Sequence, residues 1–293
     1  MTRLSRERTR APHRIVHSLV RAFSLWRCGA QTGFVDLRGV SIAWAALGKP
    51  GGRPLLMVHG LRGEAIAMLP LAREMAARGY YVVSLDMPGH GRTAPLTEAL
   101  TIPLATQVLA EFIEAFAFVE RPAIAGHSMG GWFTALLALT RSELCGPIAL
   151  LASAGVFFVP PPREILLPTR IAEARESLAL LFARPPRVPS LALYFSTRRP
   201  VATDDELLDS ALEGGDLLEG RLGALPVPAT VIWGREDRLI PPDAGRRLAA
   251  EIPGHDFHEL ADAGHMLIWE RSRRVAEIMA AFFEGRSRNG TRP

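Results

Sequence analysis

Apolar residues occur along the chain in short runs that alternate with longer stretches of helical spacing. The short runs predict eight strands: Gly33–Leu37, Val40–Ala46, Leu55–Val58, Tyr80–Leu85, Ala123–Ala125, Ile148–Ala152, Thr230–Trp233 and Phe257–Leu260. The longer stretches predict helices over Ile66–Arg78, Pro103–Phe118 and Met129–Thr140, one that begins at Pro241–Pro242, and one from about Leu267 to Phe283. Strands that alternate with helices predict an α/β fold, with a mostly parallel eight-stranded sheet flanked by helices on both faces.

One segment interrupts this alternation after the sixth predicted strand. Residues 156–228 hold ten of the 23 prolines of the chain, together with helical patches at Ile171–Phe182 and Asp204–Glu213. Their apolar content is too high for a solvated linker, so we expect a helical cap, or lid, over the carboxyl end of the sheet. The predicted organisation begins with a basic arm and helix at residues 1–28. A core follows in two pieces, residues 29–155 and 229–285, with the cap at residues 156–228 inserted between them. Residues 286–293 are expected to be a flexible tail.

The positive charge of the chain is concentrated at its N-terminus. The formal net charge is +4, but residues 1–28 contain seven Arg and one Glu, a net of +6, so the remaining 265 residues carry −2. The body of the protein is therefore not basic, and the charge gives no reason to expect nucleic-acid binding.

Residues 14–28 predict an amphipathic helix. Apolar side chains recur there at helical spacing, with the arginines placed largely elsewhere, at Ile15, Val16, Leu19, Val20, Phe23 and Trp26. Such a helix can pack on its own domain or on a second subunit, or it can lie on an anionic membrane as a peripheral contact. An Arg-rich targeting segment is a third interpretation. The pattern does not indicate the oligomeric state.

Several classes of protein are disfavoured by composition. Two cysteines, Cys28 and Cys145, are too few for a disulfide framework or a cysteine-based zinc site. No run of about 18 apolar residues predicts a spanning helix, and the N-terminus lacks the apolar core and cleavage site of a secretory signal. We therefore expect a cytoplasmic protein, peripheral at the inner membrane surface if the N-terminal helix binds lipid.

The strongest chemical motif is Gly126-His127-Ser128-Met129-Gly130, which follows an apolar strand and opens a helix. That setting is the one a nucleophile elbow requires. The tight turn strains the backbone at Ser128, and side chains at the two glycine positions would clash within it. The N-terminus of the following helix offers exposed N–H groups and a positive dipole end to developing negative charge.

A serine nucleophile needs a base and a group that orients the base, in the chain order Ser, Asp or Glu, His. Asp237 follows the strand that ends at Gly234, and His265 follows the last strand. Both fall on loops at the carboxyl ends of strands, where parallel sheets bind ligands. Glu236 and Asp262 are nearby carboxylates, but they are displaced from the position that the turn would present.

The oxyanion hole needs two backbone N–H donors. Met129, directly after Ser128, supplies one, and Leu61, in the loop after the third strand, supplies the other. Gly60 permits the turn in that loop, and we place Gly60 and His127 among the residues that line the substrate pocket. His59 and Asp86 are interpreted as residues that fix loops rather than as catalytic groups.

Residues from about 33 to 284 resemble the α/β-hydrolase fold superfamily. The resemblance rests on motifs in order along the chain: the His59-Gly60 loop, Asp86-x-Pro-Gly-x-Gly, the Ser128 elbow, Gly234-x-x-Asp237 and Gly264-His265. Within the superfamily the chain looks most like bacterial lipases and monoacylglycerol-lipase-like esterases, on the cap segment and on Ala152-Ser153-Ala154-Gly155, which leads into it. Thr93 stands where many relatives carry Ser.

The predicted function is hydrolysis of carboxylic esters of lipophilic acyl groups by a Ser-His-Asp triad, with no cofactor and no metal. A serine nucleophile disfavours dehalogenase and epoxide hydrolase chemistry. The same triad serves carbon–carbon bond hydrolases, thioesterases and cofactor-free haloperoxidases, so these alternatives stay open. A non-catalytic binding protein on this fold is a further alternative.

Overall fold

The computed structural model describes residues 12–198, 202–254 and 256–287. Residues 1–11 of the predicted arm and 288–293 of the predicted tail lie outside the described residues. The predicted N-terminal helix is present as α1 (Pro12–Arg27). At the other end, α11 (Ser272–Ser287) extends two residues into the segment expected to be tail. Within the described ranges, no helix combines the length and the apolar character that crossing a membrane requires.

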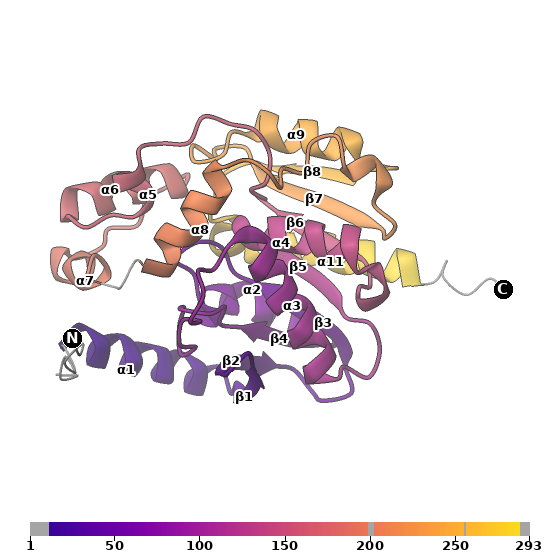
Figure 1. The fold of residues 1–293 in the computed structure, drawn as a ribbon, viewed down its shortest axis with the longest axis horizontal. Coiled ribbons are helices and arrows are strands. Elements are labelled where there is room, and N and C mark those ends of the chain that lie inside the picture. The colour runs from indigo at the N-terminus through magenta and orange to yellow at the C-terminus, as the bar shows by residue number, and fades with distance from the viewer. Residues whose placement is uncertain (1–11, 199–201, 255, 288–293) are drawn as a thin grey trace.

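The chain builds one mostly parallel sheet of eight strands in the order β1-β2-β4-β3-β5-β6-β7-β8 (Figure 1). The strands are β1 (Gln31–Leu37), β2 (Val40–Leu47), β3 (Arg53–Val58), β4 (Tyr80–Leu85), β5 (Ala123–His127), β6 (Ile148–Leu151), β7 (Ala229–Gly234) and β8 (Asp256–Leu260). The pairs β1–β2 and β2–β4 are antiparallel, and the other five pairs are parallel. This confirms the fold class and all eight predicted strands.

Helices cover both faces of the sheet. On one face α2 (Leu69–Ala76) packs against α11, and on the other α3 (Ile102–Phe116) packs against α4 (Met129–Thr140). Near the opposite edge, α9 (Pro242–Glu251) contacts β7 and β8. The central strands are buried on both sides: residues 55–58 of β3 and 148–151 of β6 have no exposed surface. Burial on both faces explains why their sequences are apolar without interruption.

Two predicted helices differ in their extent. The helix predicted over Ile66–Arg78 is a 3₁₀ turn, η1 (Ala65–Met68), followed by α2, because Pro70 lacks the N–H that a helix interior needs and is tolerated in a first turn. The C-terminal helix is likewise divided into α10 (Leu267–Glu270) and α11, since Arg271 between them has a non-helical backbone, with φ −135° and ψ 32°.

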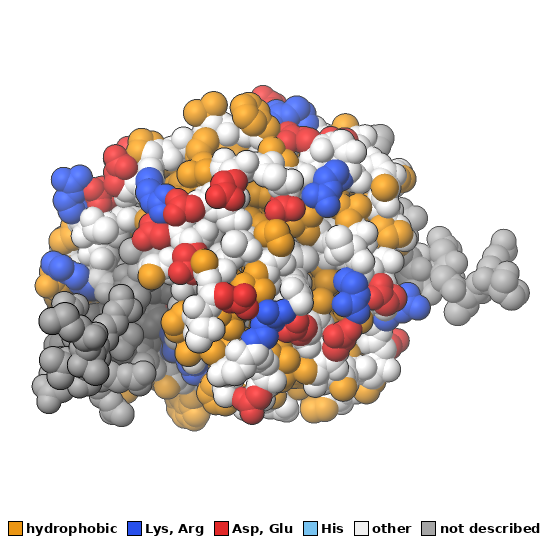
Figure 2. Space-filling model, in the orientation of Figure 1, with side chains coloured by type: hydrophobic (Ala, Val, Ile, Leu, Met, Phe, Trp, Pro, Cys, Tyr) orange, Lys and Arg blue, Asp and Glu red, His pale blue; other side chains and the backbone are white. Residues whose placement is uncertain are grey.

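The described residues between β6 and β7 form four helices, which lie together at one side of the molecule in Figure 1. They are α5 (Arg163–Leu166), α6 (Ile171–Leu181), α7 (Ser190–Ser196) and α8 (Ala202–Leu212), followed by a short turn η3 (Leu222–Ala224). The two patches that the sequence predicted correspond to α6 and α8, whereas α5 and α7 were not predicted. On the face seen in Figure 2, basic and acidic side chains of the described residues are interspersed, in keeping with a body that is not basic.

Candidate active site

Ser128 stands at a strained turn between β5 and α4. Its backbone has φ 55° and ψ −123°, a conformation that side-chain-bearing residues rarely adopt. The turn is this tight because a Cβ at Gly126 would strike the carbonyl of Gly130, and a Cβ at Gly130 would strike the carbonyl of Val58. Both glycines are therefore required sterically, and Ser128 is presented at the N-terminus of α4.

Asp237 and His265 meet at the carboxyl ends of β7 and β8. His265 Nδ1 lies 2.9 Å from Asp237 Oδ2, and both side chains are almost fully buried. The other carboxylate oxygen, Oδ1, accepts hydrogen bonds from the N–H groups of Leu239 and Ile240, each at 2.9 Å. The carboxylate is thus held in one orientation, and its bond to the imidazole places the ring proton on Nδ1.

The two carboxylates that the sequence left as competitors lie elsewhere. Glu236 accepts the backbone N–H of Ala263 at 2.9 Å. Asp262 is largely exposed and pairs with Arg184 at 2.8 Å and Arg271 at 3.0 Å. The contact with His265 is made by Asp237, as the sequence predicted.

His127 faces His265 but is committed to a backbone contact. Its Nε2 lies 2.9 Å from the carbonyl oxygen of His265, and an N–H must donate to that acceptor. Burial, together with the nearby charge of His265, lowers the pKa of His127 to about 3, so the ring stays neutral near pH 7. His127 therefore fixes the loop that carries His265, and it also lines the cavity described below.

The loop after β3 carries Leu61 and approaches Ser128 closely. A Cβ at Gly60 would lie 2.8 Å from Ser128 Cβ and 3.2 Å from its Oγ, so glycine leaves the space that the serine side chain occupies. His59 holds this loop to the next one: its Nε2 accepts the N–H of Met87 at 3.1 Å, so its Nδ1 donates to the carbonyl of Gly60 at 2.8 Å. His59 thus fixes two loops, as its sequence context suggested.

Asp86 is likewise a structural carboxylate. It accepts the backbone N–H groups of Ala65 at 2.7 Å and Arg92 at 2.9 Å. Burial raises the pKa of Asp86, against the opposing effect of these two hydrogen bonds. Its role is to shape the loops beneath the site.

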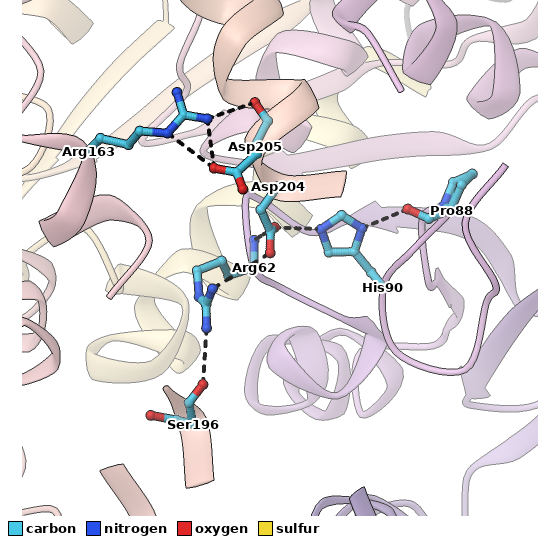
Figure 3. Close-up of polar contacts among 7 residues, drawn as sticks. All are labelled: Arg62, Pro88, His90, Arg163, Ser196, Asp204 and Asp205. Carbon is cyan, nitrogen blue, oxygen red and sulfur yellow. Dashed lines mark hydrogen bonds and ion pairs between the residues drawn. The ribbon is translucent and has the colours of Figure 1, made fainter. Parts of the chain in front are cut away.

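One buried carboxylate beside the site was not singled out by the sequence analysis. Asp204, at the start of α8, accepts the backbone N–H of Arg62 at 2.9 Å and lies 3.0 Å from His90 Nε2 (Figure 3). His90 Nδ1 in turn lies 2.9 Å from the carbonyl of Pro88, and Arg62 donates from Nη2 to Ser196 at 3.1 Å. No local motif could reveal the contacts of Asp204 with Arg62 and His90 or that of Arg62 with Ser196, because each joins residues more than 100 positions apart.

Asp204 is held ionised by this arrangement. Burial acts to raise the pKa of its carboxyl, but the hydrogen bond from His90 and the positive charge of Arg62 outweigh burial and bring the pKa below its ordinary value. The carboxylate therefore joins the helices after β6 to the loop that carries Leu61.

Ser128 and His265 line one cavity of about 640 Å³, a size typical of small-molecule sites. Leu61, Met129, Gly60 and His127 line it as well, so the described structure brings six of the seven predicted site residues to one space, with Asp237 directly behind His265. The remaining wall is mostly apolar and comes in large part from the segment after β6, through Val156, Phe158, Ile165, Leu166, Leu180, Leu181, Leu208, Ala211, Leu212 and Leu217. No group of three His, Cys, Asp or Glu side chains within the described ranges is arranged to hold a metal ion.

Comparison with known proteins places this geometry in a family. The model of the Alpha/beta hydrolase family matches residues 55–278. The chain belongs to the alpha/beta hydrolase family. The match spans the sheet from β3 onward, the Ser128 elbow, the helices after β6 and the loops of Asp237 and His265.

Relatives within this alpha/beta hydrolase family have different activities in their names. A 2-hydroxy-6-oxononadienedioate/2-hydroxy-6-oxononatrienedioate hydrolase from Cupriavidus pinatubonensis is 28% identical, over 79% of this chain and 87% of its own. Monoacylglycerol lipase ABHD6 from Bos taurus is 26% identical, over 88% of this chain and 84% of its own. The crystal structure of a bacterial membrane phospholipase A, 24% identical, superimposes with a TM-score of 0.83 over 93% of this chain and 92% of that one, which shows the shared fold.

Proposed function

We propose that the protein hydrolyses carboxylic esters of lipophilic acyl groups through a covalent acyl-enzyme on Ser128. The observation that carries this proposal is the 2.9 Å contact between His265 and Asp237 at the wall of a largely apolar cavity that Ser128 also lines. This combination supplies a nucleophile, a base with an orienting carboxylate, and a space for an acyl chain.

In the proposed reaction, Ser128 Oγ attacks the ester carbonyl while His265 Nε2 takes its proton. Asp237 stabilises the resulting imidazolium through Nδ1, and the N–H groups of Leu61 and Met129 bind the oxyanion. The alcohol leaves with the proton from His265, and Ser128 keeps the acyl group. Water that His265 deprotonates then attacks the acyl-enzyme, and collapse of the second tetrahedral intermediate releases the acid and restores Ser128.

The acyl group is proposed to lie against the helices after β6. We propose that residues 156–228 act as a cap, because the described residues of this segment contribute much of the apolar lining and no Lys or Arg to it. The name of the bovine relative, a monoacylglycerol lipase, supports a lipophilic ester substrate.

A carbon–carbon bond hydrolase is the second candidate, favoured by the name of the Cupriavidus relative. A dienedioate carries two carboxylates, and these call for cationic partners in the site. Among the described residues that line the cavity, the only Arg or Lys is Arg62, and its guanidinium is engaged by Ser196 at 3.1 Å and by Asp204 at 3.8 Å. The cavity therefore supports an uncharged apolar substrate better than a dianion.

The test is turnover of p-nitrophenyl esters of increasing acyl length, beside a thioester and a vinylogous diketone, by wild type and Ser128→Ala. We expect ester hydrolysis to favour medium or long chains, and the variant to lose at least about a thousandfold in kcat. Preferred cleavage of the diketone would support carbon–carbon chemistry instead. Unchanged ester turnover in Ser128→Ala would overturn the proposal.

A further inference from the structure

Helix α1 packs on the body with a charged residue inward and apolar residues outward. Arg21 is 8% exposed and donates from Nε to Glu64 Oε2 at 2.7 Å, and Leu25 is buried beside it in the core. Over residues 18–27, where side-chain exposure is described, the outward side carries four large apolar residues, Leu19, Val20, Phe23 and Trp26, which are 64%, 54%, 56% and 76% exposed. A surface helix ordinarily buries its apolar stripe, so this one presents an apolar face to its surroundings.

The ion pair fixes that orientation. Both side chains are nearly buried, at 10% exposure for Arg21 and 6% for Glu64. Turning the helix to bury Phe23 and Trp26 would separate the two charges, which is costly once they have been removed from water. The outward apolar face is therefore a property of the docked helix.

The inward side of α1 lies next to the wall of the substrate cavity. Glu64, which holds Arg21, directly precedes η1, and Ala67 and Met68 of η1 line the cavity. Trp269, half exposed, donates from Nε1 to the carbonyl of Ala67 at 2.7 Å. Figure 1 shows α1 along the lower left edge of the molecule.

The charge of the N-terminal segment indicates which partner covers the apolar face of α1. Helix α1 contains three arginines and no acidic residue, and residues 1–28 carry a net charge of +6, of which +5 remains once Glu64 has neutralised Arg21. A second copy bound through the same face would oppose like charges, whereas anionic lipid headgroups would complement them. Helices that lie in a membrane interface also combine aromatic and aliphatic side chains on one face with basic residues elsewhere.

We propose that α1 docks the protein on an anionic bilayer, with Leu19, Val20, Phe23 and Trp26 in the headgroup and upper acyl region. The cavity wall at η1 then lies close to the lipid, and a lipophilic substrate reaches Ser128 from the membrane. The docking stands on the geometry and charge of α1, and only the delivery of substrate rests on the proposed function.

The experiment is co-sedimentation of the full chain with vesicles of phosphatidylcholine alone and of phosphatidylcholine mixed with phosphatidylglycerol. Ser128→Ala is used throughout, so that binding is measured without turnover. We expect binding to the anionic vesicles, at least about tenfold weaker binding for Phe23→Ser/Trp26→Ser, and weaker binding at about 1 M salt. Val119→Ser removes an apolar residue that is 85% exposed outside α1, and should leave binding unchanged within about twofold.

A second measurement separates docking from catalysis. Phe23→Ser/Trp26→Ser in an active background should hydrolyse a soluble short-chain p-nitrophenyl ester as wild type does, and should lose about tenfold only on ester embedded in anionic vesicles. Equal vesicle binding by wild type and the double variant would overturn the docking proposal. A wild-type dimer that becomes a monomer in the double variant, with no vesicle binding by either, would show that a second copy covers the face and would also overturn it.

Discussion

Asp204, at the start of helix α8, accepts a hydrogen bond from the backbone N–H of Arg62, the residue directly after Leu61. Arg62 has a φ of 57°, a left-handed conformation that is unfavourable for a side-chain-bearing residue. The Asp204 carboxylate therefore helps to hold a strained loop in the shape that presents Leu61 to the cavity.

Asp204→Ala is expected to lower kcat by about tenfold or more, with a smaller rise in KM, because the N–H of Leu61, the proposed oxyanion donor, moves from its position. The free energy of unfolding should fall by about 1–3 kcal/mol, since the variant leaves polar groups of Arg62 and His90 without this acceptor. Steady-state kinetics and urea denaturation check both effects.

Asp205→Ala is the matched control. Its carboxylate is exposed and pairs with Arg163 at 2.7 Å on the outer side of α8 (Figure 3). The change should alter stability by less than about 0.5 kcal/mol and leave kcat unchanged. Equal kinetics for the two variants would show that Asp204 does not position the loop.

Asp237→Asn is expected to reduce kcat by about 10⁴-fold with little change in fold, because an amide no longer selects the Nδ1 tautomer of His265 or stabilises its cation. Asp262→Asn, at the carboxylate that pairs with Arg184 and Arg271, should retain activity close to wild type. Ester hydrolysis over a pH series measures both variants. A larger loss for Asp262→Asn would reassign the acid.

His127 makes stability depend on pH. Its folded pKa of about 3 lies below the ordinary value, so between about 3 and 6.5 the unfolded chain binds the additional proton. Its contribution to stability is therefore full above about pH 6.5 and is lost as the pH falls toward 3, by up to about 1.4 kcal/mol per pH unit.

Urea denaturation at pH 7 and pH 5 tests this dependence. The loss of stability between the two pH values should be smaller in His127→Gln than in wild type, by as much as about 2 kcal/mol. A wild-type difference retained in His127→Gln would contradict the assignment.

The buried ion pair between Arg21 and Glu64 should matter more to the free energy of unfolding than an exposed ion pair does. Glu64→Gln leaves the guanidinium of Arg21 without its carboxylate and is expected to cost about 3–5 kcal/mol, or to release α1 from the body. Glu284→Gln breaks the more exposed contact with Arg53, 2.9 Å long, and should cost less than about 1 kcal/mol. Urea denaturation and limited proteolysis after α1 distinguish the two variants, and similar effects would show that the buried pair does not anchor the helix.

Local patterns were sufficient for much of the fold. The parallel strands were predicted because they read as short apolar runs bounded by turn residues, and the antiparallel β1 and β2 because two such runs flank a turn at Arg38-Gly39. Helix α4 was predicted with its observed bounds, since the glycines of the elbow begin it and its residues are mostly apolar up to Thr140. The pairing of Asp237 with His265 followed from the rule that parallel strands end at one edge.

Features that depend on distant residues escaped prediction. Glu64 has no local signature as the partner of Arg21, which lies 43 positions away, and the sequence assigned Arg21 to the polar side of its helix without indicating that this side is buried. Asp204 reaches Arg62 across 142 positions. The extent of α2 was a local error, because Pro70 in the predicted interior already indicated a helix start.

The most direct measurement of the central claim is the site of covalent labelling by a lipophilic fluorophosphonate, mapped by mass spectrometry of the digested protein. The account predicts a single adduct on the peptide that contains Ser128, no adduct in Ser128→Ala, and labelling slowed by orders of magnitude in His265→Ala, whose serine lacks its base. An adduct that persists in Ser128→Ala, or ester hydrolysis by a wild-type protein that the reagent neither labels nor inhibits, would contradict it.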